Sequence, residues 1–331
     1  MTSTAASREW LHLDAERETM RIVQILRPQL SQILRRRGLV IGLSGGIDST
    51  VTAALAVRAL GKDKVFGLLM PERHSEAGTS SLGKKVADSL GIACIEENIT
   101  GILEALGCYR RYDEAIREVI PVFGPEWISK LVIGSITGGQ QYTTFSIVAQ
   151  APDGRVVRER LSHTAYLGIV AATNFKQRTR KMLEYYHADR LNYAVAGTPN
   201  RLEYDQGFFV KNGDGSADVK PIAHLYKSQV YALAAHLGVP VEIRERPPTT
   251  DTYSMPQGQD EFYFALPYEQ MDACLYGRNH RIPTETVAQA TGLDAAMVER
   301  VWADIDRKRG TTRYLHLAPL LVEQVTEVSP A

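Results

Sequence analysis

The sequence predicts an α/β protein with a doubly wound, mostly parallel sheet and helices on both faces. Three observations predict this fold. Short apolar runs rich in branched residues alternate with helical segments along the first part of the chain, a spacing typical of βαβ units. The first of these strands passes directly into a helix through a turn of Gly and Ser. A chain of 331 residues can also bury a large core.

The elements before residue 121 are expected in a regular order. Residues 15–37 have apolar side chains at helical spacing, and Pro28 should kink or divide that helix. Strand and helix then alternate over residues 39–43, 51–60, 64–70, 76–90, 92–96 and 103–120. We expect 109–118 of the last helix to face mostly solvent. Right-handed crossovers would bring the carboxyl ends of the strands to one edge, where open α/β sheets bind ligands.

The βα rhythm stops after this helix. Residues 143–150 and 155–161 alternate in polarity around Pro152-Asp153-Gly154, which predicts a β-hairpin. We then expect a helix from Asn174 to about residue 191, a strand at 193–197, a helix at 228–237 and a long loop at 247–259. Three helices follow, at 268–276, 283–290 and 294–308. The prediction is a single domain over 1–331, with an insertion at about 125–165 and a helical C-terminal segment at about 260–331.

Composition limits the classes of function. The net charge is zero, so no overall field favours nucleic acid or an anionic membrane. The three cysteines are far apart and form no CxxC pair, which disfavours a disulfide framework or zinc site and predicts a reducing cytoplasm. The N-terminal residues lack the apolar core of a signal peptide, and no apolar run approaches transmembrane length.

The turn from Ser44 to Ser49 predicts a site for a polyphosphate. Gly45 and Gly46 let the backbone approach a ligand, and the N-terminus of the following helix suits phosphate oxygens. Asp48 would repel phosphate unless a cation lay between them, so a bridging Mg²⁺ is expected. The turn lacks both the GKS/T ending of a Walker A loop and a GxGxxG fingerprint. The alternative is an ordinary βα turn with an acid near a helix N-terminus.

Further polar residues fall where ligands of such a sheet would lie. Glu203 follows the strand at 193–197 and is a second acid at the strand edge, where Mg²⁺ would need a partner for Asp48. Lys227 lies near a helix N-terminus, where its charge opposes the macrodipole, so an anionic partner is expected. Met70 ends the second strand; it either borders a bound adenine or is an ordinary strand end.

The Ser-Gly-Gly-Ile-Asp-Ser turn resembles the pyrophosphate loop of the N-type ATP pyrophosphatases. The ordered series of motifs over about residues 16–310 resembles the NAD synthetase family. Those motifs are the loop at 44–49, Asn174-Phe175-Lys176 with Arg178, Gly197-Thr198 with Glu203, the segment 207–218, Leu225-Tyr226-Lys227 and Pro248-Thr249.

The resemblance implies a site and a reaction. Asp48 and Glu203 would hold Mg²⁺, and catalysis would also need Lys227. ATP would be bound by Ser44, Gly45, Gly46, Asp48, Ser49, Met70, Arg178, Thr198, Lys227 and Thr249. The dinucleotide would contact Asn174, Lys176, Lys211, Asp214, Asp218 and Lys308. A carboxylate, nicotinic acid adenine dinucleotide in this family, would attack the α-phosphate of ATP, and ammonia would then displace AMP to give NAD. The resemblance also implies a homodimer.

Three departures from the family pattern bear on the substrate. The chain is longer than usual between Thr100 and Asn174, Thr198-Pro199-Asn200-Arg201 replaces a Gly-Asn-Lys-like sequence, and Arg307-Lys308-Arg309 stands for a His-Lys-Arg-like element. A ligase acting on a different carboxylic acid therefore stays open as an alternative. A tRNA-modifying pyrophosphatase and a nucleotide sensor are two further alternatives. The neutral net charge disfavours the first, and the presence of both Asp48 and Glu203 disfavours the second.

Two further expectations concern nitrogen and the insertion. The residues before the first strand are too few for an amidohydrolase domain and include no Cys, so we expect free ammonia as the nitrogen source, with a separate glutaminase subunit left open. An isolated hairpin is marginal in water, so the added segment at 132–161 should pack on something. We expect it to form part of the acyl pocket or of a dimer interface.

Overall fold

The structure is a computed structural model, and it describes residues 9–75, 78–133, 145–247, 252–258, 263–264 and 266–328. Its main sheet has four parallel strands in the order β3-β2-β1-β7. Their bounds are β1 Leu39–Gly42, β2 Val65–Leu69, β3 Ala93–Glu96 and β7 Ala194–Val195. The order places β1 inside the sheet, so the turn that follows β1 opens at the middle of the carboxyl edge.

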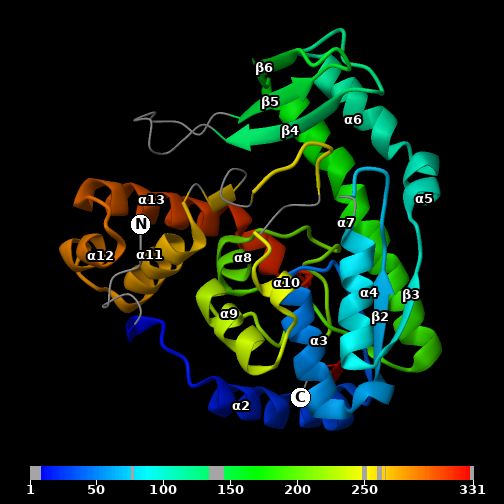
Figure 1. The fold of residues 1–331 in the computed structure, drawn as a ribbon, viewed down its shortest axis with the longest axis vertical. Helices are drawn as coiled ribbons and strands as arrows, with labels where there is room; N and C mark the ends of the chain where they lie inside the picture. The colour runs from blue at the N-terminus through cyan, green and yellow to red at the C-terminus, as the bar shows by residue number, and fades with distance from the viewer. Residues whose placement is uncertain are drawn as a thin grey trace.

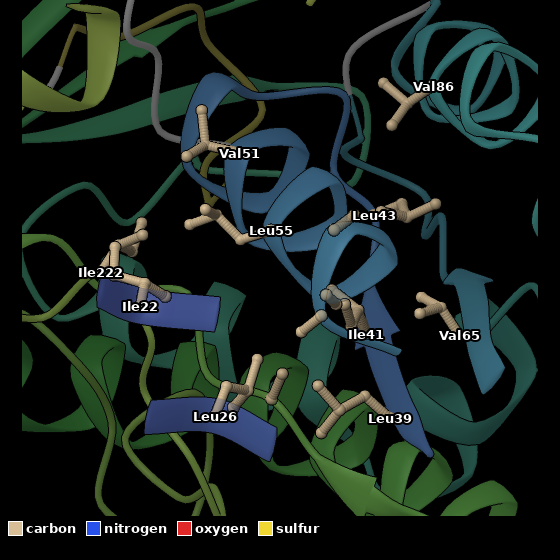
Figure 2. Close-up of a cluster of buried hydrophobic side chains, with 14 of the residues drawn as sticks. Ile22, Leu26, Leu39, Ile41, Leu43, Val51, Leu55, Val65, Val86 and Ile222 are labelled. Atoms are coloured by element: carbon tan, nitrogen blue, oxygen red, sulfur yellow. The ribbon is translucent and has the colours of Figure 1, made fainter. Parts of the chain in front are cut away.

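Helices cover both faces of this sheet (Figure 1). On one face Leu39 and Ile41 of β1 pack against α2 (Ala15–Pro28), α3 (Ile47–Leu60) and α9 (Lys227–His236), and Figure 2 shows Leu26 and Leu55 in this cluster. On the other face Val40 and Leu68 pack with residues of α5 (Thr100–Ala105), α6 (Cys108–Arg117) and α7 (His163–Leu191). Branched residues alternate between two buried layers, as in a central parallel strand. The doubly wound α/β prediction is confirmed.

Most predicted elements are present with small differences in their ends. Pro28 ends α2, and the chain continues as a π-helical segment, Gln29–Leu34, because proline removes one backbone donor from the helix. The expected helix at 103–120 is two helices, α5 and α6, separated at Gly107, whose φ of 68° is left-handed. The expectation that 109–118 faces mostly solvent holds for one side of α6, where Arg110 and Glu114 are exposed, and is wrong for the other, where Tyr109, Tyr112 and Ile116 are buried.

The hairpin in the added segment is confirmed, and it belongs to a larger sheet than expected. Strands β5 (Phe145–Gln150) and β6 (Val156–Arg160) pair antiparallel, and β4 (Ile128–Ile133), which we did not predict, pairs with β5 on its other side. Leu131 and Ile147 of this second sheet pack on apolar residues of α6 and α7. The sheet stands at the end of the molecule where α7 begins (Figure 1).

The long helix α7 begins earlier than the sequence indicated. We expected a start at Asn174, but Ser162 caps α7 by accepting a 3.0 Å hydrogen bond from the backbone N–H of Ala165, and Asn174 lies mid-helix. The remaining elements are α4 Thr79–Leu90, α8 Arg201–Gln206, α10 Val241–Arg244, α11 Tyr268–His280, α12 Thr284–Thr291, α13 Ala295–Thr312 and 3₁₀ turns at Lys62–Lys64, Arg313–His316 and Thr326–Val328. None of the described helices has the length and apolar character to cross a membrane.

Candidate active site

The turn between β1 and α3 presents a helix N-terminus bordered by two hydroxyls. Gly46 caps α3 in an extended conformation, while Gly45 has a φ of 69°. A Cβ on Gly45 would lie 2.8 Å from the Cβ of Leu82, so only glycine fits under α4. Ser49 donates a 3.1 Å hydrogen bond to the carbonyl of Gly46, and its Oγ lies 3.2 Å from Ser44 Oγ. These donors converge at the positive end of the α3 dipole, which suits an anion.

Asp48, in the first turn of α3, forms an ion pair with Lys227 from the first turn of α9. Lys227 is only 2% exposed. Burial acts to lower the pKa of Lys227, but the nearby carboxylates of Asp48 and Glu203 outweigh burial, and the net pKa is raised. The lysine is therefore a fixed cation at the phosphate turn. Asn200 donates a 3.2 Å hydrogen bond to the second Asp48 oxygen.

Glu203 is positioned by the short helix α8, which the sequence reasoning missed. Asn200 caps α8 by accepting hydrogen bonds from the backbone N–H groups of Leu202 and Glu203, and Glu203 Oε2 accepts a 3.1 Å bond from Asn200 N. Burial, and then the charge of Asp48, raise the pKa of Glu203 to about 8, with Lys227 opposing them. The pair of carboxylates on α3 and α8 is thus electrostatically costly unless a further cation is present.

This pair fits Mg²⁺ held together with a nucleotide. Among the residues that the structure describes, no cluster of three or more His, Cys, Asp or Glu side chains is arranged to hold a metal. Mg²⁺ commonly takes one or two protein carboxylates and completes its shell with water and substrate phosphates. Asp48 and Glu203 beside a phosphate-binding turn supply that donor set.

Most of the predicted site residues meet in one cavity of about 910 Å³. Its lining includes Ser44, Gly46, Asp48, Ser49, Met70, Asn174, Arg178, Thr198, Glu203, Lys211, Asp214, Lys227 and Lys308. Gly45 lies beneath α4 and is not part of the lining. Thr249 lies outside the described residues. A volume at the upper end of the range for small-molecule sites suits two substrates bound together.

Two predicted substrate contacts are placed elsewhere. Lys176 does not line the cavity; it is 3% exposed and donates hydrogen bonds to Glu72 Oε1 and to the carbonyl of Thr252, both 2.7 Å long. Asp218 is also absent from the lining, and its Oδ2 accepts a 2.7 Å bond from the backbone N–H of Val195 at the end of β7. Both side chains bond to other parts of the chain and neither lines the cavity. Their contact with the dinucleotide stays a prediction.

The far wall of the cavity carries cations that the C-terminal segment fixes. Lys211 Nζ donates to the carbonyl of Tyr314 at 2.8 Å, and Arg178 Nε donates to the carbonyl of Lys211 at 3.3 Å. Lys308, on α13, pairs with Asp304 at 2.8 Å and lies 4.3 Å from the ring centre of Tyr263. The helical C-terminal segment therefore closes one side of the cavity.

The sequence reasoning missed other lining or supporting residues. Lys181 and Glu184 line the cavity as a buried pair 2.6 Å apart, one and two helical turns beyond Arg178. They lie three and six residues beyond Arg178 in the helix predicted from Asn174, so this helical spacing already pointed to them. The Asn200 and Glu203 spacing is a capping-box signature that predicts α8. Asp272, which contacts the backbone of Lys227, gives no local signal.

A family model described as NAD synthase matches residues 18–120 and 136–311. A relative from Rhizobium meliloti (strain 1021), named NH(3)-dependent NAD(+) synthetase, is 59% identical over 322 residues, covering 97% of this chain and 96% of the relative. A relative of the same name from Thermotoga maritima is 37% identical over 241 residues, covering 72% of this chain and 79% of the relative.

Solved structures share the fold. A structure of NMN synthetase from Francisella tularensis superimposes with a TM-score of 0.64 at 23% identity, covering 94% of this chain and 99% of that chain. An NH3-dependent NAD synthetase from Campylobacter jejuni, in complex with the nitrate ion, gives a TM-score of 0.61 at 22% identity, covering 94% of this chain and 100% of that chain. At these identities the likeness shows the fold alone.

Proposed function

The chain belongs to the NAD synthase family, and from that premise we propose that it is an ammonia-dependent ligase that forms NAD. The substrates are ATP, ammonia and the carboxylic acid form of the dinucleotide, nicotinic acid adenine dinucleotide. The products are NAD, AMP and pyrophosphate. The observation that carries the proposal is the phosphate-binding turn with Asp48 and Lys227 in one cavity, in a chain 59% identical over almost its whole length to a named NH(3)-dependent NAD(+) synthetase.

The first half-reaction joins two anions. A carboxylate oxygen of the acid attacks the α-phosphorus of ATP, the bond to the bridging oxygen of the β-phosphate breaks, and pyrophosphate leaves. The backbone N–H groups at the start of α3 and the hydroxyls of Ser44 and Ser49 bind the departing pyrophosphate. Lys227 is held beside them and stabilises the charge that develops on the phosphates. Asp48 and Glu203 would hold Mg²⁺, which when bound would neutralise part of the phosphate charge.

The second half-reaction needs no protein nucleophile. Ammonia attacks the activated carbonyl, the bond to AMP breaks, and the nitrogen loses one proton as the amide forms. The contribution of the protein is to hold the two reactants together and exclude competing water, which is a large part of the rate in such reactions. The depth of the cavity, closed by α8, α9 and α13 around the turn, suits that role.

Several properties remain proposals. Met70, Arg178 and Thr198 would contact ATP, and Asn174, Lys211, Asp214 and Lys308 would contact the dinucleotide. A homodimer, a separate glutaminase that supplies ammonia and the cytoplasmic location predicted from cysteine usage stand on the sequence reasoning and on the family. Small molecules, and neither nucleic acid nor membrane, are the expected partners of the site.

One experiment tests the function directly. The purified chain is incubated with ATP, MgCl₂, ammonium and nicotinic acid adenine dinucleotide, and NAD, AMP and pyrophosphate are each measured. We expect the three products in equal amounts, and no NAD when ammonium is omitted. Nicotinic acid mononucleotide and simple carboxylic acids serve as competing acids. Faster turnover of one of these acids than of the dinucleotide would contradict the proposed substrate.

A further inference from the structure

One face of α7 forms the long wall of the cavity. Its lining residues recur at helical spacing from Tyr166 through Val170, Thr173, Asn174, Gln177, Arg178 and Lys181 to Glu184. Tyr166 and Glu184 are about five helical turns apart, or about 27 Å along the axis. At the Glu184 end, a Cβ on Gly42 would lie 2.9 Å from Glu184 Oε1, so that end adjoins β1 and the phosphate turn. The other end lies under the added sheet (Figure 1).

The end remote from the phosphate turn is aromatic. Phe145, the first residue of β5, stacks on Tyr166 with ring centres 4.0 Å apart and planes 20° from parallel. Both rings are half-buried and both line the cavity. Tyr253 and Tyr263 line the same cavity, and burial raises the pKa of Tyr166. Flat apolar faces in a partly desolvated recess are what stacking of a heteroaromatic ring requires.

The added sheet also holds the chain that completes this end. Strand β4 binds the segment 252–258 along its open edge: Ser129 N donates to Ser254 Oγ at 2.9 Å, and Met255 N donates to the carbonyl of Ser129 at 3.1 Å. The side chain of Gln257 donates to the carbonyl of Leu131. These bonds fix Tyr253, which is 4% exposed, against Tyr112 of α6. The added sheet and the segment 252–258 therefore build the aromatic end together.

We propose that Phe145 and Tyr166 form a stacking subsite for the second base of a dinucleotide acid, and that this subsite makes the chain prefer dinucleotide over mononucleotide substrates. The inference rests on the proposed function, in which ATP occupies the phosphate-turn end. A dinucleotide bound along α7 has a second heteroaromatic ring to place beyond its pyrophosphate, whereas a mononucleotide has none. Lys211, Arg307 and Lys308 line the same cavity, with Lys211 against Arg178 of α7 and Lys308 against Tyr263, and their charges suit phosphate oxygens between the two rings.

The size of the effect follows from the energy of stacking. Replacement of an aromatic residue that stacks on a base costs about 1–3 kcal/mol, which corresponds to about 5-fold to 150-fold in affinity. A residue that merely packs in the hydrophobic cluster beneath the added sheet would change stability instead and leave the relative affinity for the two acids unchanged.

The test compares Tyr166→Leu with Tyr166→Phe. The dissociation constants of nicotinic acid adenine dinucleotide and nicotinic acid mononucleotide are measured by calorimetry, together with KM for ATP and the melting temperature. We expect Tyr166→Leu to bind the dinucleotide about 5-fold to 150-fold more weakly, with unchanged mononucleotide affinity and KM for ATP, and Tyr166→Phe to resemble wild type. Phe145→Leu should behave as Tyr166→Leu does. Tyr186→Leu is the matched control, because Tyr186 is an exposed tyrosine of α7 outside the cavity.

Two results for Tyr166→Leu would overturn the subsite while leaving the proposed function intact. One is an equal loss of affinity for both acids. The other is an unchanged affinity for the dinucleotide in a variant that melts as wild type does. Leucine keeps an apolar contact with Phe145, so this variant should fold, and Tyr166→His provides a second aromatic replacement that should retain affinity. Absence of NAD formation from the dinucleotide by the wild-type chain would overturn both the function and the subsite.

Discussion

The carboxylate of Asp272 on α11 accepts hydrogen bonds from the backbone N–H groups of Lys227, at 3.2 Å, and Ser228, at 2.7 Å. Asp272 is fully buried, and its carboxylate accepts from the first backbone N–H groups of α9. The residue before this helix, Tyr226, makes no side-chain cap hydrogen bond to them. The helix start that carries the Asp48 partner is therefore fixed by the C-terminal helical segment. Cap bonds of this kind stabilise a helix by about 0.5–2 kcal/mol.

The same burial makes the stability pH-dependent. Burial raises the pKa of Asp272 from 3.8 to about 7, although its bonds to backbone N–H groups oppose the shift. Between these two values the folded chain binds more protons at this site than the unfolded chain does, so stability falls as the pH rises through this range. Asp272→Asn cannot titrate. We expect the difference in unfolding free energy, wild type minus Asp272→Asn, to fall from pH 5 to pH 7 by up to about 1.4 kcal/mol per pH unit and then to level off.

Urea unfolding at each pH measures this difference. Asp63→Asn, at an exposed position in the 3₁₀ turn Lys62–Lys64, is measured alongside as the control. A difference for Asp272→Asn that rose with pH would show that the folded chain favours the charged form of Asp272.

Loss of either acid beside the phosphate turn should abolish pyrophosphate release. Asp48→Asn and Glu203→Gln each remove an anionic oxygen ligand that Mg²⁺ prefers over an amide, and both replacements keep the size of the side chain. We expect turnover at the background level, with a melting temperature within a few degrees of wild type. A coupled pyrophosphate assay and a thermal melt check both statements, and Asp63→Asn again serves as the control. Near-normal turnover in either variant would remove the metal assignment.

Lys227→Ala should lower turnover by on the order of 10²-fold or more, because it removes a fixed cation from the developing phosphate charge. The loss also leaves the Asp48 and Glu203 carboxylates without their shared counter-ion. We expect Lys227→Arg to restore little, since a planar guanidinium does not reproduce a compact ammonium in a buried site. Steady-state kcat values decide this, with Lys85→Ala, an exposed lysine of α4, as the matched control. Wild-type turnover by Lys227→Ala would show that the residue has only a structural role.

Glutamine should not support turnover by this chain in the absence of ammonia. Glutamine use needs a cysteine thiolate, and burial raises the pKa values of Cys94, of Cys108 to about 11 and of Cys274 to about 12. The three thiols, which are all the cysteines of the sequence, are therefore protonated at neutral pH. Replacement of all three with alanine should leave ammonia-dependent NAD formation intact. NAD formed from glutamine in ammonia-free buffer would contradict the prediction.

Local signals in the sequence were sufficient for the main sheet and for the phosphate turn. Branched apolar runs, a Gly-Gly turn and an Ala-rich helix specify β1 and α3 through short-range physics. The same reasoning failed for β4, because an antiparallel strand depends on a partner that is remote in the chain, here β5. It also misplaced the inner face of α6, although Tyr109, Tyr112 and Ile116 recur at helical spacing and mark the buried side of an amphipathic helix.

The candidate site was predictable where a motif carries chemistry in consecutive residues. Asp48 and Glu203 each follow a strand of the parallel sheet, and the topology brings the ends of β1 and β7 together. The support of Lys227 was not predictable, since Asp272 lies 45 residues away on another helix. The burial of Lys176 was not predictable for a related reason: its partner Glu72 is 104 residues distant, and nothing local indicates that this lysine is held in an ion pair.

The ion pair of Lys176 and Glu72 links α7 to the end of β2 in a nearly dry environment. The side chains are 4% and 0% exposed, and Tyr109 donates a 2.8 Å hydrogen bond to the second oxygen of Glu72. Lys176 Nζ also lies 3.2 Å from His74 Nδ1, and burial followed by the charge of Lys176 lowers the pKa of His74 to about 4. His74 is therefore neutral, and the lysine is the cation on which Glu72 depends.

Removal of that cation should destabilise the fold strongly. Lys176→Met keeps much of the side-chain volume but leaves the Glu72 carboxylate buried without a counter-ion, which costs about 3–5 kcal/mol. Arg110→Met is the comparison, because it breaks an ion pair of similar length with Glu114 whose side chains are 62% and 51% exposed. The expected loss in unfolding free energy is therefore only about 0–1 kcal/mol. Urea unfolding of both variants measures the contrast. Equal losses of unfolding free energy in the two variants would show that water reaches Glu72. Partial recovery of stability in the double variant Lys176→Met with Glu72→Gln would confirm that the unpaired carboxylate causes the loss.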